Sequence, residues 1–333
     1  MVRPGAEMPN AHPGSFPVYR AERFGEVICT LGESPVWDPS SDTVTWVDSA
    51  RSRVHQIHIA SGAVKAFEFP LSISAIAQTS EGQFVASTSR GFATITIQED
   101  DARISFGIGP HLATGWRMND GACDRQGRYW SGSMAPDTSA PDGWATMFSL
   151  EGPRGVMERG GRYRTQNGLA WSSSGRTMYV SDSHRTNPHV MAYDFDCDSG
   201  EVSNGRLFAD QTGLLGGRPD GAAMDADDCY WIAASDTGRL LRLTPEGKVD
   251  AAIELDVPNP TNLCFLGPNL DTVFITTLKP GGTGPGGNIY IAKIPYQGQI
   301  APLFAGASQL EFPNTELGLR LPDDICVNPK PAE

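Results

Sequence analysis

A short unit of apolar strands and polar turns recurs along this chain. In residues 166–183 a polar residue opens an apolar strand, a Ser/Gly turn follows, and a second apolar strand comes next. Two apolar runs joined by such a turn predict a β-hairpin. Six units of this kind open, at the same distance before their turns, with the polar residues Glu33, Ser74, Asn119, Asn167, Asp220 and Asn262.

The spacing of these units indicates the architecture. They lie roughly 40 to 55 residues apart, which is the period of a β-propeller blade. A further apolar strand follows each unit, as in residues 54–59 and 92–97, and one more short strand would complete a four-stranded sheet. The pattern therefore predicts an all-β fold, a six-bladed β-propeller made of six four-stranded sheets around a channel.

The continuity of the repeats predicts the domain organisation. The repeats run through most of the 333 residues, so we expect residues 18–333 to form a single propeller domain. Residues 1–17 carry prolines among Gly and Asn, which predicts a flexible N-terminal tail. The apolar residues 27–29 could pair with the last blade and close the ring. Residues 321–327 look like the start of a seventh repeat, and the six-blade interpretation does not place them.

Charge and composition exclude several classes of partner. The net charge of −13 argues against nucleic acid and anionic membranes, because both favour a basic surface. The six cysteines form no C-x-x-C pair and several lie in apolar strands, so we expect free thiols rather than disulfides. Without a signal-peptide pattern or a membrane-length apolar run, the sequence predicts a soluble, cytoplasmic protein.

The polar residues that open the strands carry the candidate chemistry. The innermost strands of a propeller line its channel, so the starts of equivalent strands should converge at one mouth. The oxygens of Glu33, Asn167 and Asp220 would then suit a divalent cation, which would also separate two carboxylates that repel each other. The alternative is that polar side chains cap backbone groups at strand ends, and it stays open above all for Ser74 and Asn262.

Other residues give weaker signals. Gly168 and Gly221 follow two of the polar positions and would leave room for a ligand to approach the backbone. His184 and His189 flank a turn and could bind a metal, although an exposed loop explains them as well. Residues 134–143, rich in Pro, Asp and Ser, should form a loop at one mouth of the channel.

Five motifs in these repeats resemble the gluconolactonase/senescence-marker-protein (regucalcin-like) family. They are G-E-S-P-V-W at 32–37, R-M-N-D-G at 117–121, G-S-M-A at 132–135, N-G-L-A-W-S at 167–172 and R-P-D-G at 218–221. The resemblance covers nearly the whole chain after residue 25. It implies a six-bladed propeller with one divalent cation in the channel. It also implies a role in carbohydrate metabolism, as a lactonase that opens an aldonolactone to the aldonic acid.

The resemblance also implies residue roles. The family's metal ligands fall on Glu33, Asn167 and Asp220, the three positions that the repeats also favour. Its substrate-binding residues fall on Arg117 and Asn119, and its acidic lid residue falls on or next to Asp137. The chain departs from the family pattern where Ala122 replaces a common lysine after N-D-G.

The expected mechanism follows from these roles. The cation would act as a Lewis acid on the lactone carbonyl and make a water molecule more acidic. Asp220 would be the catalytic residue that steers or deprotonates this water. Arg117 and Asn119 would hydrogen-bond sugar hydroxyls or the developing oxyanion. Calcium, zinc, manganese and ferrous iron all accept such oxygens, so the sequence leaves the metal, the sugar and the oligomeric state open.

Two alternatives remain at this point. One is another metal-dependent propeller hydrolase, acting on phosphotriesters or aryl esters, which would share the metal site and differ in the pocket wall. The other is a non-catalytic metal-binding propeller, which would need no pair of carboxylates in its channel.

Overall fold

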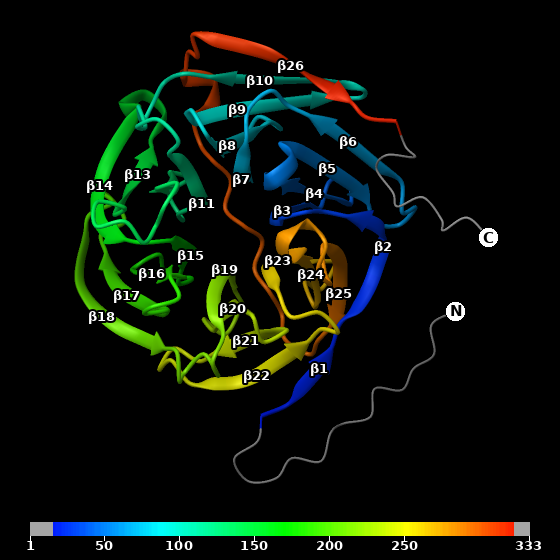
Figure 1. The fold of residues 1–333 in the computed structure, drawn as a ribbon, viewed down its shortest axis with the longest axis vertical. Coiled ribbons are helices and arrows are strands. Elements are labelled where there is room, and N and C mark those ends of the chain that lie inside the picture. The colour runs from blue at the N-terminus through cyan, green and yellow to red at the C-terminus, as the bar shows by residue number, and fades with distance from the viewer. Residues whose placement is uncertain (1–15, 323–333) are drawn as a thin grey trace.

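The computed structural model describes residues 16–322 and shows an all-β, propeller-like ring of sheets around a central channel (Figure 1). Each innermost strand contacts the next around the channel, and the last contacts the first. These strands are β3 (Gly32–Asp38), β7 (Ile73–Gln78), β11 (Arg117–Cys123), β15 (Gln166–Trp171), β19 (Arg218–Met224) and β23 (Pro260–Leu266).

The remaining strands lie further from the axis, and short 3₁₀ turns connect some of them. Those of the first half are β1 (Val18–Arg20), β2 (Glu22–Ile28), β4 (Thr43–Asp48), β5 (Arg53–His58), β6 (Val64–Glu68), β8 (Phe84–Thr88), β9 (Gly91–Gln98), β10 (Asp101–Phe106), β12 (Tyr129–Met134), β13 (Ala145–Leu150) and β14 (Val156–Tyr163). Those of the second half are β16 (Thr177–Asp182), β17 (His189–Phe195), β18 (Val202–Asp210), β20 (Tyr230–Ser235), β21 (Arg239–Leu243), β22 (Val249–Glu254), β24 (Thr272–Thr277), β25 (Asn288–Lys293) and β26 (Asn314–Arg320). The 3₁₀ turns are η1 (Ser49–Arg51), η2 (Gly152–Arg154), η3 (Pro280–Gly282) and η4 (Ala307–Gln309).

The sheets differ from the predicted six separate four-stranded sheets. The described residues form four sheets of four or five strands and one sheet of nine strands. The nine-stranded sheet arises because β26 pairs with both β10 and β6 and joins β7–β10 to β3–β6. Likewise, β1 adds a parallel fifth strand beside β22. The hairpin repeats gave no sign of either addition, because both strands lie outside the repeats and cover exposed sheet edges.

The start of the chain closes the ring, as the sequence predicted. β2 pairs antiparallel with β25, and the backbone N–H of Cys29 donates to Gly287 O at 2.8 Å. At the end of the predicted tail, Pro17 O accepts a hydrogen bond from the backbone N–H of Ala252. The rest of the tail, residues 1–15, and most of the segment 321–327 lie outside the described residues.

Apolar side chains fill the space between neighbouring sheets. Trp46, Trp130 and Trp231 are fully buried in three separate clusters of this kind. Burying a large apolar side chain contributes roughly 1.5–3 kcal/mol, so these layers hold the ring together. The five cysteines in the described part of the chain are free, as predicted.

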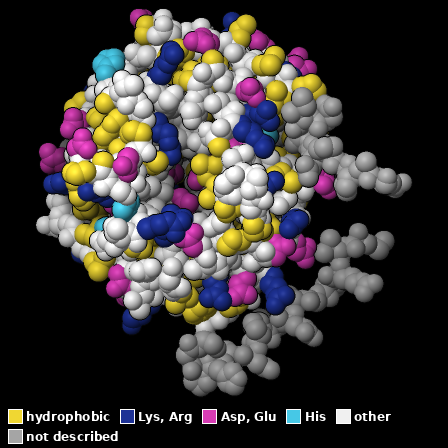
Figure 2. Space-filling view, in the orientation of Figure 1, with side chains coloured by type: hydrophobic (Ala, Val, Ile, Leu, Met, Phe, Trp, Pro, Cys, Tyr) yellow, Lys and Arg dark blue, Asp and Glu magenta, His cyan; other side chains and the backbone are white. Residues whose placement is uncertain are grey.

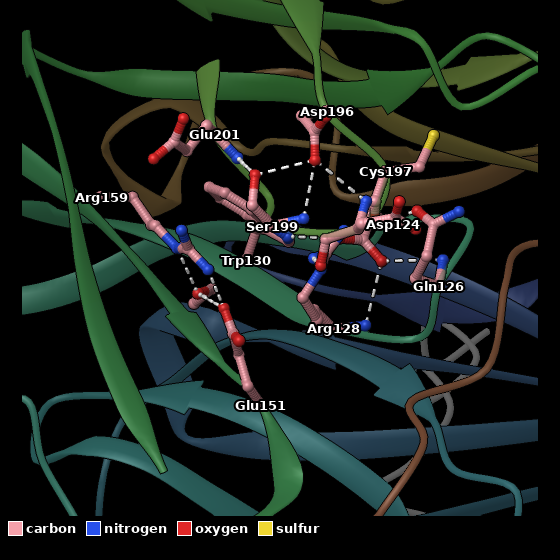
Figure 3. A network of polar contacts seen from close by, with 12 residues as sticks. Asp124, Gln126, Arg128, Trp130, Glu151, Arg159, Asp196, Cys197, Ser199 and Glu201 are labelled. Atoms are coloured by element: carbon pink, nitrogen blue, oxygen red, sulfur yellow. Dashed lines mark hydrogen bonds and ion pairs between the residues drawn. The ribbon is translucent and has the colours of Figure 1, made fainter. Parts of the chain in front are cut away.

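A buried arginine in the turn between β11 and β12 connects its sheet to the next one (Figure 3). Arg128, directly before β12, donates to the Asp124 carboxylate and to the backbone oxygens of Cys197 and Asp198 in the next sheet. Asp124 also accepts a hydrogen bond from Trp130 Nε1 at 2.9 Å. Because the buried charges are paired and hydrogen-bonded, the contact fixes the two sheets relative to each other.

Candidate functional site

Every innermost strand carries a β-bulge at or next to the polar position expected to line the channel. Between Met118 and Gly121, β11 has one residue more than the facing segment of β12 between Ser133 and Ser131. The same irregularity occurs in β3, β7, β15, β19 and β23. A bulge re-aims the side chains beside it, and the alternating sequence pattern did not predict it.

Two buried aspartates hold the chain where it enters the strands of the site. Asp48, at the end of β4, accepts the backbone N–H groups of residues 30 and 31 at 2.9 and 3.0 Å. Asp182, at the end of β16, accepts those of residues 164 and 165 at 2.7 and 3.0 Å. Each contact fixes the segment that leads into β3 or β15, and therefore positions the polar residue that follows.

The orientation of the Asn167 amide is set by a chain of hydrogen bonds. The Ser183 hydroxyl donates to Pro219 O, so it accepts from Asn167 Nδ2, which lies 2.7 Å away. Asn167 Oδ1 then faces Asn119, whose Nδ2 donates to it at 3.0 Å and to Gln166 O at 2.7 Å. Asn167 Oδ1 keeps a second lone pair for a ligand in the channel.

Three carboxyl groups meet at the same place. Burial, with the nearby carboxylates of Asp220 and Asp120, raises the pKa of Glu33 well above its usual range. Burial and the Asp120 charge raise the pKa of Asp220 to about 7, and burial raises the pKa of Asp120 to about 6. Asn262 Nδ2 lies 3.4 Å from Glu33 Oε2 as a weak donor. Without a counter-charge, this site therefore resists full ionisation.

The residues present fit a divalent cation. Glu33 and Asp220 offer carboxylate oxygens, and Asn167 offers an amide oxygen, which together form an all-oxygen ligand set. A cation between the carboxylates would replace their mutual repulsion with attraction. Figure 2 shows acidic side chains inside the hollow at the centre of the ring face.

Two arginines, Arg117 and Arg218, lie near these carboxylates, and the charge of each lowers the pKa of Asp220. Burial lowers the pKa of Arg117, and the nearby carboxylates of Glu33 and Asp220 offset part of this shift. Arg117 Nη1 donates to Met118 O at 2.9 Å, and its Nη2 lies 3.4 Å from Met134 Sδ. A guanidinium has five N–H donors, so others remain for a bound ligand.

Among the described hydrogen bonds and ion pairs, Asp137 makes none with the other site residues. The loop starts at the mouth of the channel as predicted, because β12 ends at Met134, opposite Arg117. Asp137 itself is exposed, and its Oδ1 accepts the backbone N–H of Ser139 at 2.9 Å. His184 also belongs to this surface, with its Nε2 3.2 Å from Ser139 Oγ, and does not join the channel oxygens.

Ser74 and Asn262 have the backbone contacts that the capping alternative predicted. Ser74 Oγ lies 2.8 Å from Met118 O and 2.9 Å from Asn119 O, and so connects β7 to β11. Asn262 Oδ1 accepts the backbone N–H of Leu263 at 2.8 Å.

The space beside the two glycines of the site is filled by protein. A Cβ at Gly221 would lie 2.0 Å from Asn262 Cγ. A Cβ at Gly168, where φ is +61°, would lie 2.5 Å from the Tyr230 hydroxyl oxygen and 2.7 Å from Ser181 Oγ. The prediction that these glycines leave room for a ligand is therefore wrong, since they leave room for neighbouring strands.

Sequence reasoning missed Asp120 and Ser183 as parts of the site. Neighbouring residues of a regular strand point to opposite faces, so Asn119 and Asp120 should not act at one place. The bulge in β11 removes that restriction. Their position in the chain was the available signal. Asp120 lies within the motif at 117–121, and Ser183 ends the hairpin unit at 166–183.

Comparison with known proteins identifies the family. Residues 31–279 match the family model described as the SMP-30/Gluconolactonase/LRE-like region. The chain belongs to this family. Two curated relatives align with most of this chain. A 6-deoxy-6-sulfogluconolactonase of Pseudomonas putida is 30% identical over 83% of this chain and 95% of its own length. The regucalcin of Gallus gallus is 29% identical over 75% and 84%.

A solved structure supports the fold of this chain. It is described as a calcium-binding protein, regucalcin, from Agrobacterium tumefaciens, with a TM-score of 0.72 and 22% identity. The match covers 86% of this chain and 99% of that structure. Within residues 16–322, no helix is long and apolar enough to cross a membrane.

Proposed function

We propose that this protein is a metal-dependent sugar-lactone hydrolase that opens an aldonolactone to the aldonic acid. The observation that supports the proposal is that the buried carboxyl group of Glu33 lies near those of Asp220 and Asp120, so that burial and mutual repulsion raise its pKa. Asn167, whose amide is oriented by Ser183 and Asn119, is the third ligand in this proposal. The sulfogluconolactonase relative, which aligns over 95% of its length, supports the same reaction class.

Glu33, Asn167 and Asp220 would hold the cation. When bound, the cation would supply Lewis acidity toward the lactone carbonyl. The calcium-binding regucalcin structure favours calcium among the metals that these oxygens accept.

Asp220 serves as the general base. Its carboxylate takes a proton from the attacking water as the oxygen adds to the lactone carbonyl carbon. The acyl C–O bond then breaks, the ring oxygen takes up a proton, and the hydroxy acid is released.

Arg117 and Asn119 bind the sugar in different ways. Both amide hydrogens of Asn119 are already committed, to Gln166 O and Asn167 Oδ1, so its carbonyl oxygen is left to accept from a hydroxyl. Arg117 keeps free N–H groups and therefore donates to a hydroxyl oxygen or to the developing oxyanion.

Several finer features belong to the same proposal. We take the nine-stranded sheet as two blades joined by β26, which gives six blades, one for each innermost strand. The single domain 18–333, the cytoplasmic location and the lid role of Asp137 stay predictions.

A substrate panel tests the proposal. The protein is stripped with a chelator, reloaded separately with calcium, zinc, manganese or ferrous iron, and assayed against sugar lactones, a phosphotriester and an aryl ester. We expect the highest kcat/KM with a sugar lactone and no turnover without metal. Preference for the phosphotriester or aryl ester would point to a different propeller hydrolase, and no turnover with any substrate would point to a binding protein.

A further inference from the structure

Cys29, Asp48 and His55 come together between two adjacent sheets, and none of them belongs to the channel site. Cys29 follows β2 of the closing sheet, Asp48 ends β4 and His55 lies in β5. One possible ligand atom from each lies within 4.8 Å of the other two. All three are buried, and His55 is only 3% exposed.

The His55 ring is the feature that ordinary packing leaves unexplained. Both of its ring nitrogens are buried without a hydrogen-bond partner. Leaving such polar atoms unpaired in the interior is costly to folding. The ring stacks on Trp46 with centroids 5.2 Å apart and planes 16° apart, so its position is fixed. Burial lowers the pKa of His55 to about 3, which leaves the ring neutral and able to offer a nitrogen lone pair.

The two other side chains keep capacity for a further ligand. The Asp48 oxygens each accept one backbone N–H, from Thr30 and Leu31, and each has another lone pair. Trp46 Nε1 lies 3.3 Å from Cys29 Sγ, where it would stabilise a thiolate. Arg51 Nη1 approaches Asp48 Oδ2 only to 3.7 Å, from an exposed position.

We propose that Cys29, Asp48 and His55 form a second metal site, which binds zinc. A thiolate, an imidazole nitrogen and a carboxylate oxygen are ligands that zinc takes in proteins. Calcium and magnesium prefer oxygen ligands alone, so this site and the all-oxygen channel site select different ions.

Charge and position both favour this assignment. A thiolate and a carboxylate together neutralise a divalent cation, so the occupied site adds no net charge to the interior. Burial raises the pKa of the Cys29 thiol, and its proton would therefore leave as the cation binds. The ion would join the segment after β2 to β4 and β5, where the start of the chain closes the ring, and would stabilise the native state.

Cobalt substitution of the full-length protein tests the site. The protein is produced in cobalt-supplemented, zinc-depleted medium, because the buried site fills most readily during folding. A cobalt–thiolate bond gives a charge-transfer absorption in the near ultraviolet, whereas the channel site has no sulfur. We expect this absorption in the unchanged protein and in Glu33→Gln, which removes only a channel ligand.

Matched variants separate the site from other thiols. Cys29→Ser and His55→Gln should abolish or strongly weaken the absorption and lower bound cobalt by about one ion per chain. Cys264→Ser removes another buried thiol of the same apolar cluster and should change neither. If Cys29→Ser fails to fold, the absorption spectrum of the unchanged protein still tests the proposal. A cobalt-loaded unchanged protein without the absorption would overturn it. An absorption that survives in folded Cys29→Ser overturns it equally.

Discussion

Asn119 Nδ2 lies 3.0 Å from Asn167 Oδ1, so a residue expected to bind substrate also holds an expected metal ligand. Contacts that orient a metal ligand typically contribute 10–100-fold to metal affinity. We therefore expect Asn119→Ala to weaken metal binding by about tenfold or more and also to raise KM. Isothermal titration of chelated protein measures the first effect, and kinetics at saturating metal measure the second.

Asn204→Ala is a suitable control, because Asn204 lies on exposed β18 and contacts only Asp194 among the described hydrogen bonds. Unchanged metal affinity in Asn119→Ala would show that Asn167 is oriented without it, and that the Ser183 contact is sufficient.

The raised pKa of Asp220 predicts an unusual pH dependence of stability in metal-free protein. Its pKa rises from 3.8 to about 7 on folding, so the native state binds more protons than the unfolded state between these values. Stability from this group is fully present below pH 4 and is lost as the pH rises through 7, by on the order of 4 kcal/mol in total.

Thermal melts in chelator at pH 5 and pH 8 measure this effect. Other groups titrate in the same range, so the comparison is with Asp220→Asn, which lacks the ionising group. We expect the melting temperature of the unchanged protein to fall more between the two pH values than that of the variant, and added metal to reverse the difference. Parallel pH profiles would mean that Asp220 ionises freely.

Asp120 should act through its charge rather than as a ligand. It accepts the backbone N–H of Leu169 at 3.3 Å and raises the pKa of both Glu33 and Asp220. Asp120→Asn keeps an oxygen acceptor and removes the charge, so we expect the metal Kd to rise about tenfold, from a lost charge interaction of about 1–3 kcal/mol. Turnover at saturating metal should change little.

Titration of metal into Asp120→Asn, beside the exposed Asp194→Asn, measures this effect. An unchanged Kd in Asp120→Asn would show that its charge does not reach the cation.

Gly221 is the position where a single methyl group should disturb the site most directly. A Cβ there would lie 2.0 Å from Asn262 Cγ, so Gly221→Ala must displace Asn262 from Glu33. We expect a loss of about 1–3 kcal/mol in the free energy of unfolding, as for other overpacked sites. In Gly213→Ala the new Cβ would meet its nearest atom at 3.5 Å, so denaturant unfolding of that variant provides the baseline.

The sequence predicted the hairpin units, because hydrophobic periodicity and turn residues determine them locally. It predicted the closing strand from the general need of a ring of sheets to cover its open edge. It could not predict β26 as the strand that joins two sheets, because that pairing depends on the edges of β6 and β10, which lie far away in the chain. The contribution of Asp120 was hidden for a related reason. It depends on a β-bulge, and a bulge is a property of two paired strands rather than of one.

Turnover of a sugar lactone by Asp220→Asn, at the same metal occupancy as the unchanged protein, tests the central claim most directly. Acid release at constant pH is followed while bound metal is quantified on the same sample. Asparagine keeps the size and one oxygen ligand but cannot accept the proton of the attacking water. Loss of a general base typically costs 10²–10⁴-fold, so we predict a fall in kcat of roughly a hundredfold or more. Near-normal turnover with metal bound would contradict the role of Asp220 and with it the proposed mechanism.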